Sequence, residues 1–486
     1  MQKWITRFSA QPVLTIVMLG LLLLQTGNWT LPLIDRDEPR FAEASREMLQ
    51  RGDFIVPHLN GNYRFDKPPL IYWCQAASYV VFGDTPPAAR LPSVVFSIGT
   101  ALLLYSWGRR LGSERAGFAA ALIFLTCLQV LIHGRLAVAD MAMIFFVTAA
   151  FWSGWEMTRP ETNRRAAWWL MFYLSLGLGF LAKGPIAWFP LGGLFLGRWL
   201  LPQSFRLKAW EMIAGLLLSL GIIAAWGIPA LLATDGEFFK IGIGRHVVQR
   251  SIGVLDGHGG KNIVSYVVSL PLYVGTFFIS FFPWAFAVPI RLKTWWKSRA
   301  SDPLGHYLIL QAIVVFVVFS LVRTKLPHYT LPAFPCLALW LAWVSRGIEG
   351  AERKLARGVV AMGILCLVLT LGVFPIFRAQ VASANLWEQT REFVRPQTRI
   401  ASVGFEEPSL VWEMRKQTTN YIQIIGREQA VEWLKQAPGS ILILPTRDYR
   451  ELLAAQATNH LIRTVKGLDT GNFKRWDLTV VIHKQP

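Results

Sequence analysis

The sequence is poor in charge and in cysteine. Charged residues make up 16% of its 486 residues, and only four cysteines are present. Cys127, Cys336 and Cys366 lie inside apolar runs and Cys74 stands in a more polar stretch, which excludes a disulfide framework and a zinc-finger spacing. The sequence also lacks a P-loop, a dinucleotide fingerprint, an HExxH motif and a GxSxG elbow. Any chemistry that requires energy must therefore draw on the substrate itself.

Apolar and aromatic residues are abundant instead. Hydrophobic residues make up 53% of the chain, including 21 Trp and 31 Phe, and long apolar runs recur along it. Runs of this length predict an α-helical polytopic membrane protein, and the first run is expected to be a retained helix. The windows predict about eleven membrane helices, with an error of two, near residues 11–31, 91–108, 116–133, 139–157, 167–182, 185–201, 211–233, 267–290, 307–322, 329–345 and 358–377.

The formal charge of +19 raises the question of a nucleic-acid partner. No Lys/Arg tract with interleaved aromatics supports one, and the basic residues gather in alternate connecting segments between apolar runs. By the positive-inside rule these segments and the N-terminus are cytoplasmic. The opposite set is expected outside and comprises the opening loop 32–90, the turn 133–140, the turn around residue 183, the loop 233–266 and the turn 323–328.

The last hundred residues differ from the rest. Strand-like runs at 399–405, 440–445 and 476–483 alternate with helical patterns at 427–435 and 449–455. We therefore expect a membrane domain over residues 1–378 and a soluble α/β domain over residues 379–486. An odd number of membrane helices would place this domain outside.

The opening loop carries the densest charge. Pro39 predicts a short helix that runs to about Gln50, with Asp37 and Glu38 at its start, where the helix dipole favours negative charge. An ionised Asp37 suits a general base or a metal ligand, although a simple N-cap remains the alternative. Apolar residues recur every three to four positions, so one face is expected on the membrane surface. The polar face is expected in water and comprises Arg40, Glu43, Arg46 and Glu47.

Other charged residues fall on the same expected outer side. Lys67 precedes two prolines, and its ammonium could pair with a lipid phosphate or only snorkel to the interface. Each of the others could be a simple helix-end anchor, but together the basic groups suit a phosphate better than a neutral solute. These candidate pocket residues are Asp140, Lys183, Arg245, His246, Arg250, Lys325 and His328.

Three segments of the opening loop resemble a known family. The segments beginning DEPRFAEASREML at Asp37, GDFIVPHL at Gly52 and FDKPP at Phe65 resemble the first loop of bacterial lipid A aminoarabinose transferases, within the protein O-mannosyltransferase-like group. The segment KLPHYTLP at Lys325 resembles a later loop of that group. The resemblance implies a GT-C glycosyltransferase fold with thirteen membrane helices. It also implies an undecaprenyl (polyprenyl) monophosphate sugar donor and transfer at the periplasmic face of the inner membrane.

The resemblance also assigns roles to residues. Asp37 matches the catalytic aspartate and Glu38 the acid beside it, while Arg40 and Lys67 match contacts to the donor phosphate. Asp66 occupies a position where the family commonly has Glu, which makes it a candidate ligand for a divalent metal ion. The resemblance implies no other cofactor.

The expected function is an inverting glycosyltransferase that moves aminoarabinose, or a related amino sugar or hexose, to lipid A or another envelope acceptor. Lys183 and Lys325 are further candidates for the donor phosphate. Two enzyme alternatives are a protein O-mannosyltransferase-like enzyme with a protein acceptor and a ligase that uses a diphosphate donor. A lipid or solute transporter is disfavoured, because transporters gather polar groups at the bilayer midplane whereas the charges here gather at one face.

Overall fold

The computed structural model describes residues 11–159, 162–200, 208–242, 244, 263–435, 439–453 and 460–483. By internal contacts the chain divides into two compact units. The first, which we call the membrane unit, comprises Met1–Thr26, Phe65–Ile71 and Arg90–Leu367. The second, the loop-tail unit, comprises Gly27–Arg64, Tyr72–Ala89 and Val368–Pro486, so it groups most of the opening loop with the C-terminal residues. The domain limits expected from the sequence, 1–378 and 379–486, stay a prediction.

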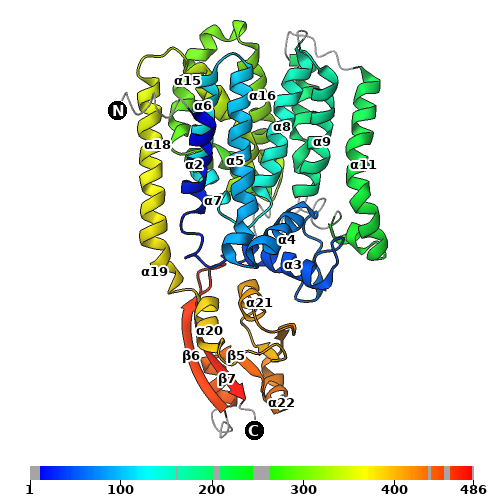
Figure 1. The fold of residues 1–486 in the computed structure, drawn as a ribbon, viewed down its shortest axis with the longest axis vertical. Helices are drawn as coiled ribbons and strands as arrows, with labels where there is room; N and C mark the ends of the chain where they lie inside the picture. The colour runs from blue at the N-terminus through cyan, green and yellow to red at the C-terminus, as the bar shows by residue number, and fades with distance from the viewer. Residues whose placement is uncertain are drawn as a thin grey trace. The chain divides into compact units, whose positions relative to one another are not determined.

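The membrane unit is a bundle of helices, and α9 packs against both α8 and α11 (Figure 1). Its helices are α2 (Pro12–Gln25), α5 (Pro86–Arg110), α6 (Glu114–Leu125), α7 (Leu128–His133), α8 (Asp140–Thr158), α9 (Arg165–Lys183), α10 (Phe189–Leu200), α11 (Ala209–Ala233), α13 (Ile263–Ser269), α14 (Leu272–Ser280), α15 (Ala287–Ser298), α16 (Pro303–Leu321), α17 (Phe334–Val344) and α18 (Ala351–Val368). Short 3-10 helices connect some of these helices, among them η1 (Pro185–Trp188), η3 (Trp284–Phe286) and η5 (Pro327–Ala333).

Each of the predicted windows contains helix, but not every window is one continuous helix. In the described part of the chain, five helices are long and apolar enough to cross a membrane, or six if one bent pair counts as a single span. That pair, Tyr266–Ser280 and Trp284–Ser301, bends by 115°, so the expectation of one helix over 267–290 is wrong. Pro283 stands at the bend, and its missing N–H and its ring interrupt a helix there.

Glycine lets α5 and α6 approach closely. A Cβ atom on Gly108 would lie 2.3 Å from the Cα atom of Gly117, a separation that real side chains never show. The two helices are joined by a short turn, and Ser113 caps α6 by accepting a hydrogen bond from the N–H of Ala116. Helix contact at this corner therefore depends on the absence of a side chain at both glycines.

The loop-tail unit contains a sheet and several short helices. The sheet has the order β4-β3-β5-β7-β6, in which β3 is parallel to β4 and β5, and β7 is antiparallel to β5 and β6. The unit also holds a two-stranded hairpin and most of α4, an apolar helix that the sequence windows did not include. Its strands and helices are β1 (His58–Leu59), β2 (Asn62–Tyr63), β3 (Ile400–Ser402), β4 (Gln423–Ile424), β5 (Ile441–Pro445), β6 (His460–Leu468), β7 (Arg475–His483), α3 (Asp37–Arg51), α4 (Leu70–Phe82), α19 (Phe374–Arg378), α20 (Ala382–Thr390), α21 (Pro408–Met414), α22 (Ala430–Lys435) and α23 (Thr446–Leu452).

The strand predictions for the C-terminal region are confirmed. The three strand-like runs correspond to β3, β5 and β7, and the two helical patterns to α22 and α23. β5 is buried because apolar side chains pack on both faces of the sheet, in two separate clusters. The neighbours β4 and β6 were not predicted, since β4 is two residues long and β6 alternates too weakly to stand out.

Candidate functional site

A buried ion pair joins α8 and α9 in the membrane unit. Asp140 is the first residue of α8 and Lys183 is the last residue of α9. The Nζ atom of Lys183 lies 2.5 Å from Oδ1 of Asp140, and both side chains are about nine-tenths buried. Acidic groups are favoured at helix N-termini and basic groups at C-termini, so both helix dipoles support this placement. The pair is therefore stabilised locally as well as by its own attraction.

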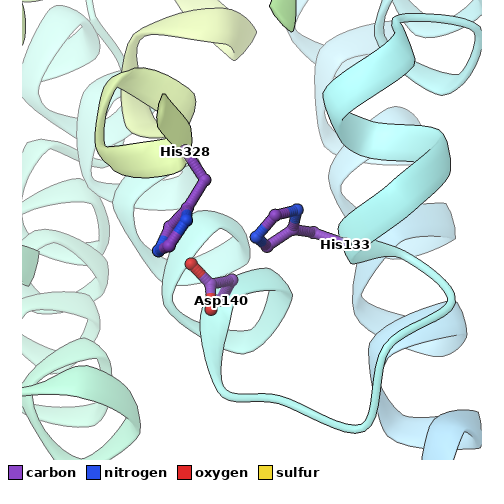
Figure 2. A group of neighbouring side chains, drawn as sticks. All are labelled: His133, Asp140 and His328. Carbon is purple, nitrogen blue, oxygen red and sulfur yellow. The ribbon is translucent and has the colours of Figure 1, made fainter. Parts of the chain in front are cut away.

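Two histidines converge on Asp140, one from the end of α7 and one from η5 (Figure 2). One donor atom from each of His133, Asp140 and His328 lies within 4.8 Å of the other two. The two imidazole rings are 4.8 Å apart between centroids, and the Nδ1 atom of His133 is 2.9 Å from the side-chain amide of Gln129. Segments distant in the sequence thus form one polar pocket, which we call the histidine pocket.

The electrostatics of this pocket keep His328 uncharged. Burial is the largest cause that lowers the pKa of His328, to about 3, and the carboxylate of Asp140 only partly opposes it. The charges of Lys183, His133 and Lys67 lower the pKa further. His328 is therefore neutral at physiological pH and can act through hydrogen bonds. The charge of Lys67 has the smallest of these effects on His328.

Lys325 has a different environment from the one that the sequence suggested. Its ammonium group donates to the backbone carbonyls of Ser320 at 2.5 Å and Val322 at 2.9 Å, and it is 5% exposed. It also lies 5.6 Å from the ring centroid of Tyr266 and 5.8 Å from that of Tyr273. The last carbonyls of a helix have no partner within the helix, so Lys325 caps the end of α16. Its role at a donor phosphate stays a prediction.

Three predicted residues of the opening loop, Asp37, Glu38 and Arg40, lie on α3 in the loop-tail unit. Asp37 is the exposed first residue of this helix, and Arg40 is half-buried one turn later. Glu38 is buried, and its Oε2 atom accepts a hydrogen bond from the N–H of Ile34 at 2.9 Å. Glu38 thus holds the chain that enters the helix, while the carboxylate of Asp37 faces outward.

The polar face of α3 is not in water, and that expectation is wrong. Glu43, Arg46 and Glu47 are at most 2% exposed. The Nη1 atom of Arg415 lies 2.5 Å from Glu43 and 2.7 Å from Glu47, and the guanidinium of Arg46 stacks 3.7 Å from the ring centroid of Trp412. These partners come from α21 and the residue that follows it, so the C-terminal region covers this face. Sequence reasoning missed Arg415 because it is distant in the chain and belongs to no motif.

The metal prediction at Asp66 is not supported by a ligand cluster. Among the described residues, His, Cys, Asp and Glu side chains form two groups with metal-binding spacing, and Asp66 belongs to neither. One group is the histidine pocket, where the ammonium of Lys183 already neutralises Asp140, so we assign no metal to it. The other lies in the loop-tail unit. Three further candidates, Arg245, His246 and Arg250, lie outside the described residues.

Comparisons with known proteins identify sequence relatives. Residues 66–228 match a family described as dolichyl-phosphate-mannose-protein mannosyltransferase. The undecaprenyl phosphate-α-4-amino-4-deoxy-L-arabinose arabinosyl transferase of Edwardsiella ictaluri is 30% identical over 69% of this chain and 59% of its own length. The enzyme of the same name from Pectobacterium atrosepticum is 31% identical over 77% of this chain and 66% of its own length. The chain therefore spans less than two thirds of these relatives, and their activity is not transferred by similarity alone.

A solved structure confirms the fold. ArnT from Cupriavidus metallidurans, in a crystal structure with undecaprenyl phosphate bound, aligns with a TM-score of 0.78 over 99% of this chain and 98% of that chain. The two sequences are 17% identical, so this likeness shows the fold. The predicted resemblance, the GT-C fold and the multi-span membrane architecture with a small C-terminal sheet are therefore confirmed.

Proposed function

Because this chain is a relative of the undecaprenyl-phosphate aminoarabinose transferases and has the GT-C fold, we propose that it is an inverting glycosyltransferase. Its donor is a sugar on undecaprenyl monophosphate, and aminoarabinose is the sugar that the relatives' names favour. Its acceptor is lipid A, and transfer takes place at the periplasmic face of the bacterial inner membrane. The distribution of basic residues supports this orientation, since it leaves the opening loop outside.

One observation carries the proposal: basic groups gather at a buried polar pocket in the membrane unit. Lys183 lies in the histidine pocket, and the charge of Lys67 acts on the same pocket. A phosphate on a lipid would meet the ammonium group of Lys183 and the neutral imidazole of His328 there, with the charge of Lys67 acting on the same pocket. Such donors stabilise an anion far more effectively in a site with little water than in solution.

In the reaction, an acceptor oxygen forms a bond to the anomeric carbon while the bond from that carbon to the donor phosphate breaks. The electron pair of the broken bond stays on polyprenyl phosphate, whose growing charge Lys67, Lys183 and Arg40 stabilise. Asp37 accepts the proton of a hydroxyl acceptor. If the acceptor is an ionised lipid A phosphate, no proton moves, and Asp37 orients the acceptor and stabilises the positive sugar ring.

Mass spectrometry of lipid A tests the proposal. A deletion strain and its complemented counterpart are grown alike, and lipid A from each is compared. We expect a pentosamine increment on lipid A in the complemented strain and its loss in the deletion strain. Unchanged lipid A in both strains, under conditions where the protein is expressed, would refute the acceptor assignment.

A second candidate is a protein acceptor, which the family match over residues 66–228 favours. The donor class and the roles of Lys67 and Lys183 would be the same. Glycopeptide mass spectrometry of periplasmic proteins from the two strains separates the candidates. A hexose on peptides from the complemented strain, with lipid A unmodified, would support the protein acceptor.

A further inference from the structure

Three acidic side chains meet in the loop-tail unit, at a place that the transfer reaction does not use. Asp35 lies two residues before α3, Glu407 precedes α21, and Asp469 follows β6. One carboxylate oxygen from each lies within 4.8 Å of the other two. Glu407 is 9% exposed and Asp469 is 2% exposed, so water has little access to the charges. We call this group the acidic cluster.

The acidic cluster carries more negative charge than its neighbours balance. The guanidinium of Arg36 contacts Glu407 at 3.2 and 3.4 Å, but this side chain is half exposed. When all three carboxyl groups are ionised, one guanidinium leaves two formal negative charges.

One oxygen atom of Asp469 has no hydrogen-bond donor among the described residues, although its carboxylate lies beside that of Glu407. The Oδ1 atom of Asp469 accepts a hydrogen bond from the N–H of Gly471 at 2.7 Å, whereas Oδ2 is buried without a donor. A buried carboxylate oxygen without a donor is costly and therefore points to a missing ligand. The hydroxyl of Thr470 lies 3.4 Å from Oδ2 of Asp35, which adds another oxygen at the edge of the cluster.

We propose that the acidic cluster binds a hard divalent cation, with Ca²⁺ as the best-fitting ion. Its donors are oxygen atoms from Asp35, Glu407 and Asp469, and its charge would balance the excess that Arg36 leaves. Carboxylate and hydroxyl oxygens are the ligands that Ca²⁺ and Mg²⁺ prefer, and the flexible coordination of Ca²⁺ suits three carboxylates from separate segments. The cluster has no imidazole or thiolate ligand of the kind that selects Zn²⁺.

Such an ion would join the entry of α3 to the C-terminal region. Asp35 belongs to the opening loop, whereas Glu407 lies between β3 and β4 in the sequence and Asp469 lies between β6 and β7. Asp37 lies two residues after Asp35, so the ion would fix the backbone that presents this carboxylate. Its role is positioning, and the inference does not depend on which sugar or acceptor the enzyme uses.

Thermal unfolding of the full-length protein in a nonionic detergent tests the cation site, with CaCl₂ added after chelation by EDTA. We expect the Tm of the wild type to rise by several degrees at about 10 mM Ca²⁺, since extracellular-type calcium sites bind with Kd of about 0.1–1 mM. Asp469→Asn keeps the shape and the Oδ1 acceptor but removes one charge. We expect it to weaken binding at least about tenfold, as measured by isothermal titration.

Without Ca²⁺, the order of the unfolding temperatures should be reversed. In EDTA, Asp469→Asn should unfold at a higher temperature than the wild type, because it relieves repulsion between carboxylates. Asp477→Asn, which changes an exposed acid on β7, serves as the matched control and should respond to Ca²⁺ like the wild type. If Asp469→Asn does not fold, Glu407→Gln replaces it. Equal Ca²⁺ responses in the wild type and the cluster variant, or no response in the wild type, would overturn the proposal.

Discussion

Removing Lys183 alone, Asp140 alone and both together distinguishes a structural ion pair from a phosphate contact. Lys183→Met keeps the length of the side chain and removes the ammonium, and Asp140→Asn keeps the shape and removes the negative charge. If the ammonium only neutralises Asp140, the double variant should recover what either single variant loses. If the ammonium also stabilises the leaving phosphate, the double variant should stay inactive.

The buried geometry sets the size of the effect. The two side chains are about nine-tenths buried and their charged atoms are 2.5 Å apart, so either single variant leaves an uncompensated buried charge. Breaking such a pair typically costs about 3–5 kcal/mol of stability, whereas replacing both partners is often neutral. Loss of one preorganised donor to a developing oxyanion typically lowers kcat by about 100- to 1,000-fold. Stability and turnover therefore respond differently in the double variant.

The assay uses purified protein in detergent with undecaprenyl-phosphate aminoarabinose and lipid A, followed by mass spectrometry, alongside thermal unfolding of each variant. We expect the double variant to unfold near the wild-type temperature and to transfer sugar at about 1% of the wild-type rate or less. Arg165→Met, which breaks a more exposed pair with Glu211 at the opposite end of α9, is the control and should retain activity. A double variant with both wild-type stability and wild-type turnover would refute the phosphate contact at Lys183.

Three further predictions concern α3 and its neighbours. Asp37→Asn should lower kcat by about 100-fold or more in a kinetic assay of transfer. The unfolding temperature should not change, because the side chain is exposed. Full transfer activity of this variant would show that Asp37 takes no part in the reaction. Arg40→Ala combined with Lys67→Ala should abolish transfer and weaken donor binding, measured by equilibrium dialysis with undecaprenyl phosphate. Transfer that survives both changes would refute the assignment of Arg40 and Lys67 to the donor phosphate. Arg415→Met should destabilise the protein by about 3–5 kcal/mol in thermal or denaturant unfolding, since two buried carboxylates lose the guanidinium that contacts both. The exposed Arg391→Met should change stability by at most about 1 kcal/mol, and equal effects would contradict the buried network.

The sequence predicted well where a feature is local. Apolar runs located helix in every window, and the position of Pro39 together with the acids before it predicted α3 within a few residues of its observed limits, Asp37–Arg51. Strands β3, β5 and β7 were found because their buried side chains form short apolar runs. The placement of Asp140 and Lys183 at helix ends was also visible, although their pairing was not.

The sequence failed where partners are distant. The polar face of α3 has the pattern of a solvated face, and only the position of Arg415, more than 360 residues away, turns it into a buried charge network. The acidic cluster has the same origin, since Glu407 and Asp469 have no spacing that suggests a site. No pattern in the sequence indicates that the side chain of Lys325 turns back onto the end of α16, and its role at a donor phosphate stays a prediction.

The buried network between α3 and the C-terminal region has a consequence for engineering. Arg415 contacts Glu43, and Trp412 contacts Arg46, as closely as residues of a single core. Helix α3 and the C-terminal region should therefore be kept together when segments are exchanged between proteins. A chimaera that exchanges the last hundred residues with those of a relative should also exchange the opening loop. A shortened protein that ends before α20 would expose this face of α3 and remove Arg415, the partner of Glu43 and Glu47, and we expect it to be degraded in cells.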